Sequence, residues 1–235
     1  MITVITPTTG KDTLFNTISS IKSQTLNVPI NHLLLWDDKR EDEFLYPCEN
    51  RLITRNPLDL ECIENNYCCN SIVIRGSLVQ DNAAGSALRA VGLMAANTDY
   101  VVFADDDVMW EVNHLETMIK KLEESKSDWG FCKRAIWVTE DTGFECLGID
   151  EFESVGEDAK TPYKMVDNNC MIFKRKYGVS AACLYRNTEK YNDDRLMYSF
   201  LMKYAGVPCK TNLATVNQIC PRKLIGFFKE NCSKI

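Results

Sequence analysis

Over the first half of the chain, short apolar runs follow one another with segments of helical apolar spacing between them, and this order predicts the secondary structure. Four short runs of mostly aliphatic residues predict strands at 1–5, 33–36, 72–74 and 100–104. Two segments between them have apolar residues at helical spacing: Leu14, Phe15, Ile18 and Ile21 after Asp12 as N-cap, and Ala84, Leu88, Val91 and Ala95. Strands and helices that alternate with short connections predict a parallel sheet covered by helices.

Beyond Trp110 the pattern changes. Apolar positions at 115, 118, 119 and 122 predict another helix, and three further strands are expected at 129–132, 135–138 and 171–173, separated by acidic turns. A last helix is expected from about Asp193 to Ala205, with Gly206 as its stop and one apolar face: Leu196, Phe200, Leu201 and Tyr204. We find no internal repeat or linker. One domain, 1–235, is therefore predicted, with a first half at 1–110 and a second at 111–235.

Composition narrows the class of protein. The chain has 235 residues, 45% of them hydrophobic, and a formal net charge of -6, which together indicate an ordinary globular protein. A nucleic-acid partner is not expected, because binding phosphates needs a basic face. The 11 cysteines show no C-x-x-C spacing, so we expect free thiols in a reducing, cytoplasmic location and no structural zinc. Three of them lie in apolar stretches and are expected to pack as small hydrophobes: Cys132, Cys170 and Cys183.

No apolar stretch is long enough to predict a transmembrane segment, and the first residues do not form a signal peptide. The C-terminal segment R-K-L-I-G-F-F-K, residues 222–229, has an amphipathic character. A peripheral contact with an anionic membrane is one interpretation of it. We expect instead that it packs against the core.

Polar residues follow three of the predicted strands. They are Thr6-Pro7-Thr8, Asp37-Asp38 and Asp105-Asp106-Asp107. In open parallel sheets ligands bind at the carboxyl ends of the strands, so these clusters are expected to meet at one edge. If the third cluster continues its strand, Asp105 and Asp107 project to one side and Asp106 to the other. Two nearby carboxylates repel one another unless a cation such as Mg²⁺ or Mn²⁺ lies between them. A solvated acidic loop is the alternative interpretation.

Several of these segments resemble inverting glycosyltransferases of the GT-A fold, close to family 2. I-T-V-I-T-P-T-T-G is similar to the family's first strand and loop, and L-L-L-W-D-D is similar to its second strand. The most specific likeness lies in 81–107, D-N-A-A-G-S-A-L-R-A-V-G-L-M-A-A-N-T-D-Y-V-V-F-A-D-D-D, which resembles the family's glycine-containing helix, strand and D-x-D motif. Ala90 departs from it, since the family usually has asparagine there. The resemblance implies an α/β GT-A domain with a mostly parallel central sheet and a smaller mixed acceptor-side part.

The resemblance also implies roles on the donor side. Asp37, with Asp38 beside it, corresponds to the aspartate that binds the nucleotide base, and Arg89 to a residue near the base or diphosphate. Asp105 corresponds to a ribose or metal contact and Asp107 to the principal ligand of Mn²⁺ or Mg²⁺. The nucleotide-sugar site implied in this way comprises Thr6, Pro7, Thr8, Asp37, Asp38, Gly85, Arg89, Asp105 and Asp106. A surface salt bridge is the alternative interpretation of Arg89.

An inverting transfer also needs a base that takes the proton of the acceptor hydroxyl. The family uses an aspartate at the start of a helix in the second half, and here Asp194 corresponds to it, with Asp193 as the second candidate. Helix capping alone also explains aspartates at this position. Asn168 and Asn169 stand where many relatives have glycine, and no histidine follows His114 as a later metal ligand. The metal is then expected to rely on aspartate, diphosphate and water.

The resemblance implies transfer of a hexose from a nucleotide diphosphate sugar, a UDP-sugar by preference, to a hydroxyl of a sugar, glycan or other acceptor. The alternatives are a non-catalytic GT-A-like module that binds sugars or proteins, and a Mg²⁺-dependent phosphatase of the haloacid dehalogenase type. In that phosphatase the D-x-D motif ends the first strand, whereas here it ends the fourth. A P-loop does not fit, because Ile5 stands where it needs glycine. A sugar nucleotidyltransferase needs a glycine-rich loop that T-P-T-T-G does not provide.

Overall fold

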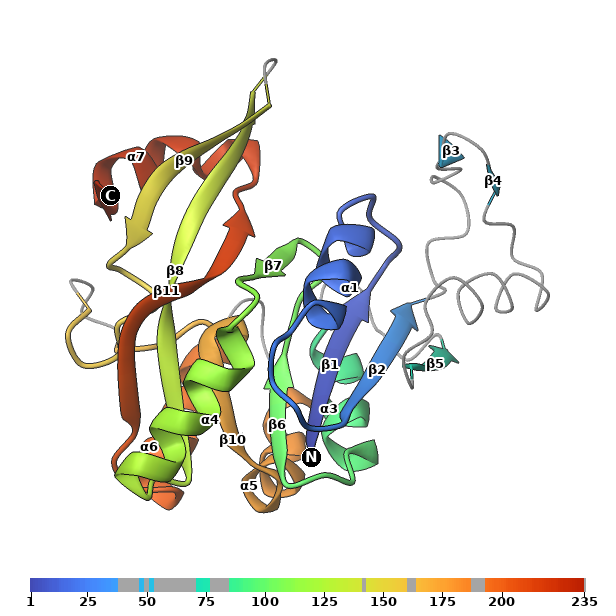
Figure 1. Ribbon diagram of the computed structural model, residues 1–235, viewed down its shortest axis with the longest axis vertical. Helices are drawn as coiled ribbons and strands as arrows, with labels where there is room; N and C mark the ends of the chain where they lie inside the picture. Colours follow the sequence, from blue (N-terminus) through green and yellow to red (C-terminus); the bar gives the residue numbers. More distant parts are fainter. Residues whose placement is uncertain are drawn as a thin grey trace.

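The computed structural model describes residues 1–37, 47–48, 51–52, 71–76, 85–140, 143–159, 164–186 and 193–234. Ten strands in this part of the chain form one sheet, in the order β12-β9-β8-β10-β6-β1-β2-β5, with β11 paired to both β7 and β8. Helices cover both faces: α4 lies in front of the sheet in Figure 1, and α3, α5 and α6 lie behind it. Both predicted halves therefore contribute strands to the same sheet.

The first half forms the parallel part of the sheet that the sequence predicts. Its strands are β1 (Ile2–Thr8), β2 (Ile30–Asp37), β5 (Ser71–Gly76) and β6 (Tyr100–Phe103). All three pairings, β5 with β2, β2 with β1, and β1 with β6, are parallel. Every residue of β1 is buried, as expected for a strand covered on both faces. β1 continues three residues beyond the predicted end at Ile5, so Thr6, Pro7 and Thr8 belong to the strand itself.

Helix α1 (Leu14–Lys22) packs on the sheet much as predicted. Leu14, Ile18 and Ile21 are buried, while Phe15 is half-buried. The N-cap is Thr13 instead of Asp12. The hydroxyl of Thr13 donates a hydrogen bond to the backbone oxygen of Asp106 at 2.6 Å, so this residue connects the start of α1 to the D-D-D segment.

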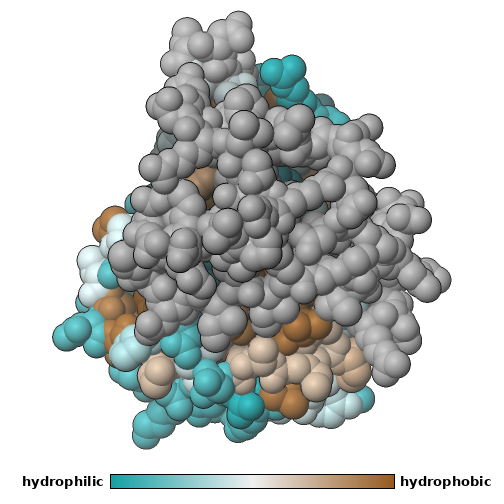
Figure 2. All heavy atoms as spheres, turned by 90° about the vertical axis from the view of Figure 1, so that its right-hand side faces the viewer, coloured by the Kyte–Doolittle hydropathy of each residue, from teal (hydrophilic) through white to brown (hydrophobic). Residues whose placement is uncertain are grey.

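Helix α3 (Ser86–Ala95) turns a different face to the sheet from the one predicted. Leu88 is buried as expected, but Ala95 is exposed and Arg89 and Gly92 are buried instead. Gly92 explains the difference, because a Cβ there would lie only 2.5 Å from Cγ2 of Ile5 on β1. The missing side chain lets the helix backbone approach the sheet closely. Figure 2 shows the molecule from the right-hand side of Figure 1, where hydrophobic and hydrophilic described residues lie intermixed at the lower end.

The chain from Val108 onward forms the mixed part of the sheet. Its elements are β7 (Val108–Trp110), α4 (His114–Ser125), β8 (Trp129–Glu140), β9 (Gly143–Asp150), η1 (Asn168–Cys170), β10 (Met171–Lys174), α5 (Arg175–Ala181), η2 (Ala182–Arg186), α6 (Asp193–Tyr204), β11 (Cys209–Ile219), η3 (Arg222–Leu224), α7 (Ile225–Asn231) and β12 (Cys232–Ser233). The short strands β3 (Pro47–Cys48) and β4 (Arg51–Leu52) form a separate pair. Helix α4 and strand β10 confirm the predictions for 115–122 and 171–173.

The prediction of two separate strands at the start of the second half is wrong. The strands expected at 129–132 and 135–138 are one strand, β8, which passes through Lys133 and Arg134 without interruption. The strand continues because Arg134 is only 2% exposed and its charge is paired with buried carboxylates, so it behaves as a core residue. Strands β9 and β11 were not predicted, because their sequences are too polar to show a clear apolar run.

Helix α6 begins at Asp193 and ends before Gly206 as predicted, and Gly206 adopts a positive φ of 81°. The predicted apolar face is partly wrong. Met197 and Leu201 are buried, whereas Leu196 is 39% and Tyr204 57% exposed. The helix is therefore rotated relative to its sequence pattern.

The C-terminal segment packs against the core as expected. Phe228 of α7 is buried in a small cluster with Ile136, Val138 and Cys220. Leu224 remains 39% exposed, and contact with an anionic membrane stays a prediction. Within the described ranges, no helix has both the length and the apolar character needed to cross a membrane.

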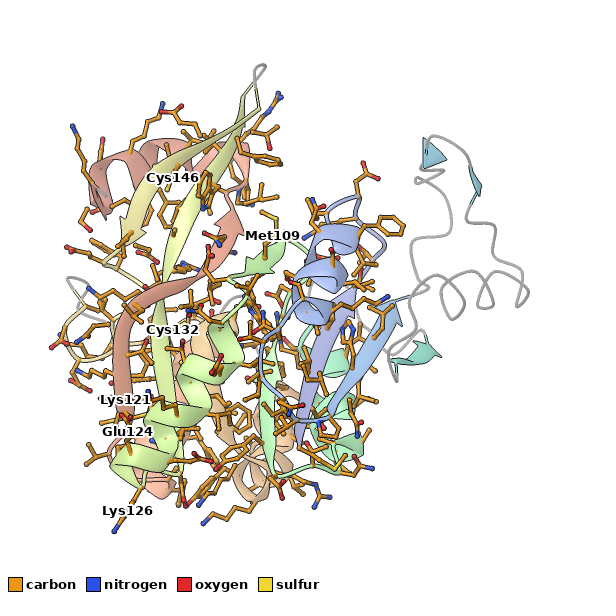
Figure 3. The ribbon with its side chains drawn as sticks, in the orientation of Figure 1. Met109, Lys121, Glu124, Lys126, Cys132 and Cys146 are labelled. Carbon is orange, nitrogen blue, oxygen red and sulfur yellow. The ribbon has the colours of Figure 1, made fainter. Side chains whose placement is uncertain are left out.

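The described cysteines are free thiols in different surroundings. Cys132 on β8, labelled in Figure 3, and Cys170 are buried as expected. The prediction for Cys183 is wrong, because its side chain is exposed. Its position at a helical turn on the surface leaves it outside the core in spite of its apolar neighbours.

Candidate active site

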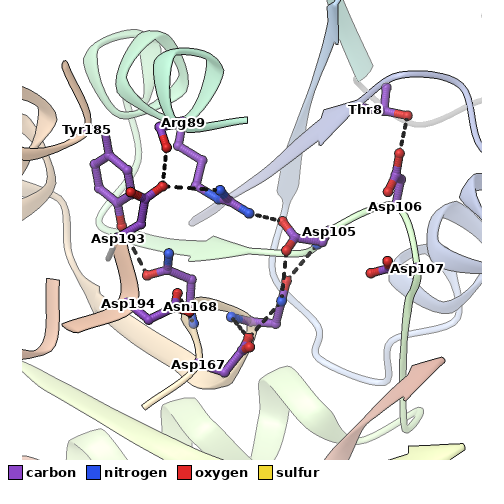
Figure 4. Close-up of polar contacts among 12 residues, drawn as sticks. Thr8, Arg89, Asp105, Asp106, Asp107, Asp167, Asn168, Tyr185, Asp193 and Asp194 are labelled. Carbon is purple, nitrogen blue, oxygen red and sulfur yellow. Dashed lines mark hydrogen bonds and ion pairs between the residues drawn. The ribbon is translucent and has the colours of Figure 1, made fainter. Parts of the chain in front are cut away.

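The three consecutive carboxylates lie immediately after β6, at the carboxyl end of the parallel strands (Figure 4). They are not part of the strand, which ends at Phe103, and they form a turn in which Val108 N–H donates to the Asp105 carbonyl at 3.1 Å. The predicted alternation of side chains along a strand therefore does not apply. Each aspartate has its own set of partners.

Asp106 holds the loop that follows β1. Its Oδ2 accepts hydrogen bonds from the Thr8 hydroxyl at 2.8 Å and from the Thr9 N–H at 3.4 Å. Asp106 is 4% exposed, so the interpretation as a solvated acidic loop is wrong for this residue. The expectation that the Thr6–Thr8 and Asp105–Asp107 clusters meet at one edge is confirmed by the contact between Thr8 and Asp106.

Lys11, which the sequence did not single out, lies across two of the carboxylates. Its Nζ is 2.8 Å from Oδ1 of Asp106 and 2.8 Å from Oδ2 of Asp107. Burial alone would lower the pKa of Lys11, but the charges of Asp107 and Asp106 outweigh it and raise the pKa above its ordinary value. Burial raises the pKa of Asp107, against the opposing effect of Lys11. At this edge of the sheet, one lysine therefore already forms ion pairs with two of the three carboxylates.

Arg89 of α3 contacts carboxylates from both halves of the chain. Its Nη2 donates to Asp105 Oδ1 at 2.5 Å, and its Nη1 lies 3.6 Å from Asp193 Oδ2. The Ser86 hydroxyl also donates to Asp193. The alternative of a surface salt bridge is wrong, because Arg89 is only 6% exposed. Burial would lower the pKa of Arg89, but Asp105 and the other nearby acidic groups raise it, so the guanidinium stays charged.

Gly85 caps the start of α3 with a left-handed φ of 82°. A Cβ at this position would lie 3.1 Å from Cβ of Pro7, so the glycine allows the helix start to lie against the end of β1. The structure thus brings Gly85, Pro7 and Arg89 close to the carboxylates.

Asp193 and Asp194 form the first turn of α6 and point to different partners. Asp193 is bonded to Ser86 and Arg89, whereas Asp194 Oδ1 accepts from the backbone N–H of Asn168 at 3.1 Å. Burial raises the pKa of Asp194 well above its ordinary value, and the negative charge of Asp167 adds to this effect. A carboxylate with a raised pKa is a better proton acceptor, as a general base requires.

The remaining residues predicted for this edge either lie in the core or fall outside the part of the chain that the structure describes. Thr6 is fully buried, and its hydroxyl is 2.9 Å from Nε2 of His32, so it contributes to the core. Burial lowers the pKa of His32 to about 4. Asp37 ends β2 opposite Gly76, but its side chain lies outside the described part, as does all of Asp38.

Asp167, Asn168 and Asn169 also belong to the site, although the sequence pattern gave them no role. Asn169 is hydrogen-bonded to Asp105, and the side chain of Asn168 accepts from the Tyr185 hydroxyl at 3.0 Å. The sequence signal was the pair of asparagines at positions where many relatives have glycine. Only the structure shows that one of them contacts the D-D-D segment.

Comparison with known proteins supports the fold and part of the sequence interpretation. Residues 69–145 match the family described as glycosyl transferase family 2. No curated protein sequence matches the chain. The crystal structure of S. aureus TarS 1-349 superposes with a TM-score of 0.66 at 16% identity, and the match covers 93% of this chain and 60% of that one. The chain has the GT-A fold. The predicted likeness to family 2 glycosyltransferases is confirmed by this fold and by the matched segment.

Two further structures with the GT-A fold carry ligands. TarS 1-349 in complex with UDP-GlcNAc matches with a TM-score of 0.65 at 15% identity, covering 94% of this chain and 59% of that one. TarS 1-349 in complex with UDP matches with a TM-score of 0.59 at 14% identity, covering 97% and 62%. The GT-A chain described here thus spans about three-fifths of the length of these structures.

Proposed function

We propose that this protein is a metal-dependent, inverting glycosyltransferase that moves a sugar from a nucleotide diphosphate sugar to an acceptor hydroxyl. The observation that carries the proposal is the position of Asp194. Its carboxylate has a raised pKa and accepts from the N–H of Asn168, while the next residue, Asn169, donates to Asp105. Arg89 contacts Asp105 and also Asp193, the residue before Asp194. The site thus contains both a set of carboxylates for a donor complex and a separate candidate base.

The donor is proposed to be a UDP-sugar. The family 2 match and the TarS structures with UDP-GlcNAc and UDP support this choice. The diphosphate is placed at the carboxyl ends of β1 and β6, next to Asp105 and Asp107. Lys11 and Arg89 provide the positive charges of the described part that lie closest to these carboxylates. The base of the nucleotide is assigned to Asp37 and Asp38.

The residues fit a divalent cation. Asp105 and Asp107 offer the oxygen ligands that Mn²⁺ and Mg²⁺ prefer, and these ions commonly take one or two carboxylates together with phosphates. The described residues contain no group of three or more His, Cys, Asp or Glu side chains able to hold a metal ion, so diphosphate and water are needed to complete the ligand set. When bound by Asp107 and Asp105, the cation supplies positive charge for the leaving diphosphate.

The transfer step uses Asp194 as its base. The acceptor hydroxyl gives its proton to the Asp194 carboxylate, and its oxygen forms a bond to the anomeric carbon from the face opposite the diphosphate. The bond between the anomeric carbon and the diphosphate oxygen breaks, and UDP leaves with the electron pair. One displacement inverts the configuration at the anomeric carbon. Asp193 is the second candidate, but its bonds to Arg89 and Ser86 favour a supporting role.

Release of UDP from a panel of UDP-sugars, with Mn²⁺ and with EDTA, tests the proposal. We expect Mn²⁺-dependent release that Asp107→Ala removes. Two alternatives predict other results. A non-catalytic GT-A-like module releases no UDP from any donor under either condition, and a phosphatase releases inorganic phosphate from simple phosphate esters.

A further inference from the structure

The side chain of Asn169 is held between two aspartates. Its Oδ1 accepts from the backbone N–H of Asp105 at 2.6 Å, and its Nδ2 donates to Asp105 Oδ2 at 3.1 Å and to Asp167 Oδ1 at 2.7 Å. Only this orientation of the amide places an acceptor against the N–H and a donor against the carboxylates. Asn169 is also 2% exposed. Its position is therefore fixed on both sides.

Asp167 is itself anchored from the other side by a buried arginine. Its Oδ1 accepts from the backbone N–H of Asn169 at 2.9 Å, and its Oδ2 accepts from Nη1 of Arg134. Arg134 also donates to Asp150 Oδ2 at 2.8 Å and to Glu153 Oε2 at 2.6 Å, and it is 2% exposed. Because breaking a buried ion pair is costly, this cluster keeps Asp167 in one place.

The same turn also reaches the proposed base. The backbone N–H of Asn168 donates to Asp194, while the Asn168 side chain is bonded to Tyr185. Two consecutive residues thus contact the two carboxylates with the most different proposed roles. Asn169 contacts Asp105 on the donor side, and Asn168 contacts Asp194 on the acceptor side.

We propose that Asn169 is a positioning residue for donor binding, which acts by holding the Asp105 carboxylate in one orientation. Arg89 binds Oδ1 of Asp105 and Asn169 binds Oδ2, so both oxygens are fixed from protein groups. Loss of the amide frees Oδ2 and removes the acceptor of the Asp105 N–H. In the wild-type protein the turn 167–170 also contacts Asp194 through the N–H of Asn168, so it fixes the separation between the donor carboxylates and Asp194. This inference rests on the proposed function of the site.

A double-mutant cycle between Asn169→Ala and Asp105→Asn tests whether Asn169 acts through Asp105. The measurement is the dissociation constant of UDP and of a UDP-sugar in Mn²⁺, by titration calorimetry. In the wild-type background we expect Asn169→Ala to weaken binding roughly 10-fold or more, as loss of a hydrogen bond to a charged group implies. In the Asp105→Asn background we expect the same change to cost less than about threefold, because the group it positions is already altered.

Asn31→Ala is the control, since it removes a hydrogen-bonded asparagine side chain near the amino end of β2, away from the carboxyl ends where Asp105 lies. We expect it to change donor affinity less than about threefold. Asn169→Ser replaces Asn169→Ala if the alanine variant does not fold, and urea unfolding of each variant checks stability separately. Equal losses in both backgrounds, or equal losses for Asn31→Ala and Asn169→Ala, overturn the inference. Absence of any donor binding by the wild-type protein overturns the proposed function instead.

Discussion

The ammonium of Lys11 lies 2.8 Å from Oδ2 of Asp107, the carboxylate that is proposed as the principal metal ligand. The same ammonium contacts Asp106, so one lysine offsets part of the negative charge at this edge. Asp106 is also bonded to Thr8 and is buried, whereas Asp107 has Lys11 as its hydrogen-bond partner. A cation that binds Asp107 must therefore compete with Lys11.

This competition predicts the effect of Lys11→Met on metal binding. The substitution keeps the aliphatic stem of the side chain and removes its charge. In the absence of nucleotide, Mn²⁺ should therefore bind about fivefold more tightly, because an ion pair worth roughly 1 kcal/mol corresponds to about this factor in affinity. Electron paramagnetic resonance of free Mn²⁺ measures this affinity. Lys120→Met, on the exposed side of α4, is the control and should leave it unchanged. Unchanged or weaker Mn²⁺ binding by Lys11→Met contradicts the competition.

The pKa of Asp194 predicts how turnover depends on pH. Burial, with Asp167 beside it, raises this pKa, and a base works only when it is ionised, so kcat should rise as the pH rises through the raised pKa and then level off. Asp194→Asn should lower kcat by roughly 10²- to 10⁴-fold. The affinity for UDP should stay nearly unchanged.

Asp193→Asn is the matched comparison for this prediction. Because Asp193 is bonded to Arg89 and Ser86, its substitution should weaken donor binding or stability more than it alters the proton-transfer step. The assignment is reversed if Asp194→Asn retains turnover and Asp193→Asn loses it.

The burial of His32 predicts that the free energy of unfolding depends on pH, independently of the chemistry at the candidate site. Its buried ring has a pKa lowered to about 4, and the ordinary value in an unfolded chain is about 6.5. The neutral ring therefore favours the folded state above pH 6.5, and this contribution is lost as the pH falls towards 4. Between pH 7 and pH 5 the loss is about 2 kcal/mol.

Urea unfolding at pH 7 and pH 5 measures this contribution. His32→Gln removes the titrating group, so the decrease in unfolding free energy over this range should be about 2 kcal/mol smaller than in the wild-type protein. Carboxylates common to both proteins cancel in the comparison. Equal decreases in the two proteins show that His32 does not cause the pH dependence.

The close packing of α3 on β1 predicts opposite effects for two glycine substitutions within helices. Gly92→Ala places a Cβ 2.5 Å from Cγ2 of Ile5 and should lower the unfolding free energy by roughly 1 to 3 kcal/mol. Gly226→Ala in α7 has open space around the new Cβ and should raise it by up to about 1 kcal/mol. Urea unfolding at pH 7 measures both, and stabilisation by Gly92→Ala contradicts the packing argument.

The sequence predicted the parallel part of the fold well because its strands are apolar and its helices are periodic. The meeting of the Thr6–Thr8 and Asp105–Asp107 clusters also followed from strand order alone, since carboxyl ends of parallel strands share one edge. The mixed part was harder. The apolar residues of β11 are scattered among polar ones, and Arg134 looks like an interruption of β8 until its buried carboxylate partners are known.

The individual contacts of the site could not be predicted. Lys11 lies far in sequence from Asp106 and Asp107, and neither its residue type nor that of Asn169 identifies such a partner. Asn169 is likewise far in sequence from Asp105. The directions of the three aspartate side chains could not be predicted either, for a physical reason. The segment is a turn, so each side chain takes a direction that strand geometry does not give.

The central claim is that Asp105 and Asp107 form part of a nucleotide-sugar site that a divalent cation completes. Thermal unfolding with a panel of UDP-sugars, with Mn²⁺ and with EDTA, tests it most directly, because a ligand at 100 times its Kd stabilises the folded state by about 2.7 kcal/mol. The account predicts that at least one UDP-sugar raises the Tm in Mn²⁺, and that EDTA or Asp107→Ala abolishes the increase. No increase with any UDP-sugar, with or without Mn²⁺, contradicts it.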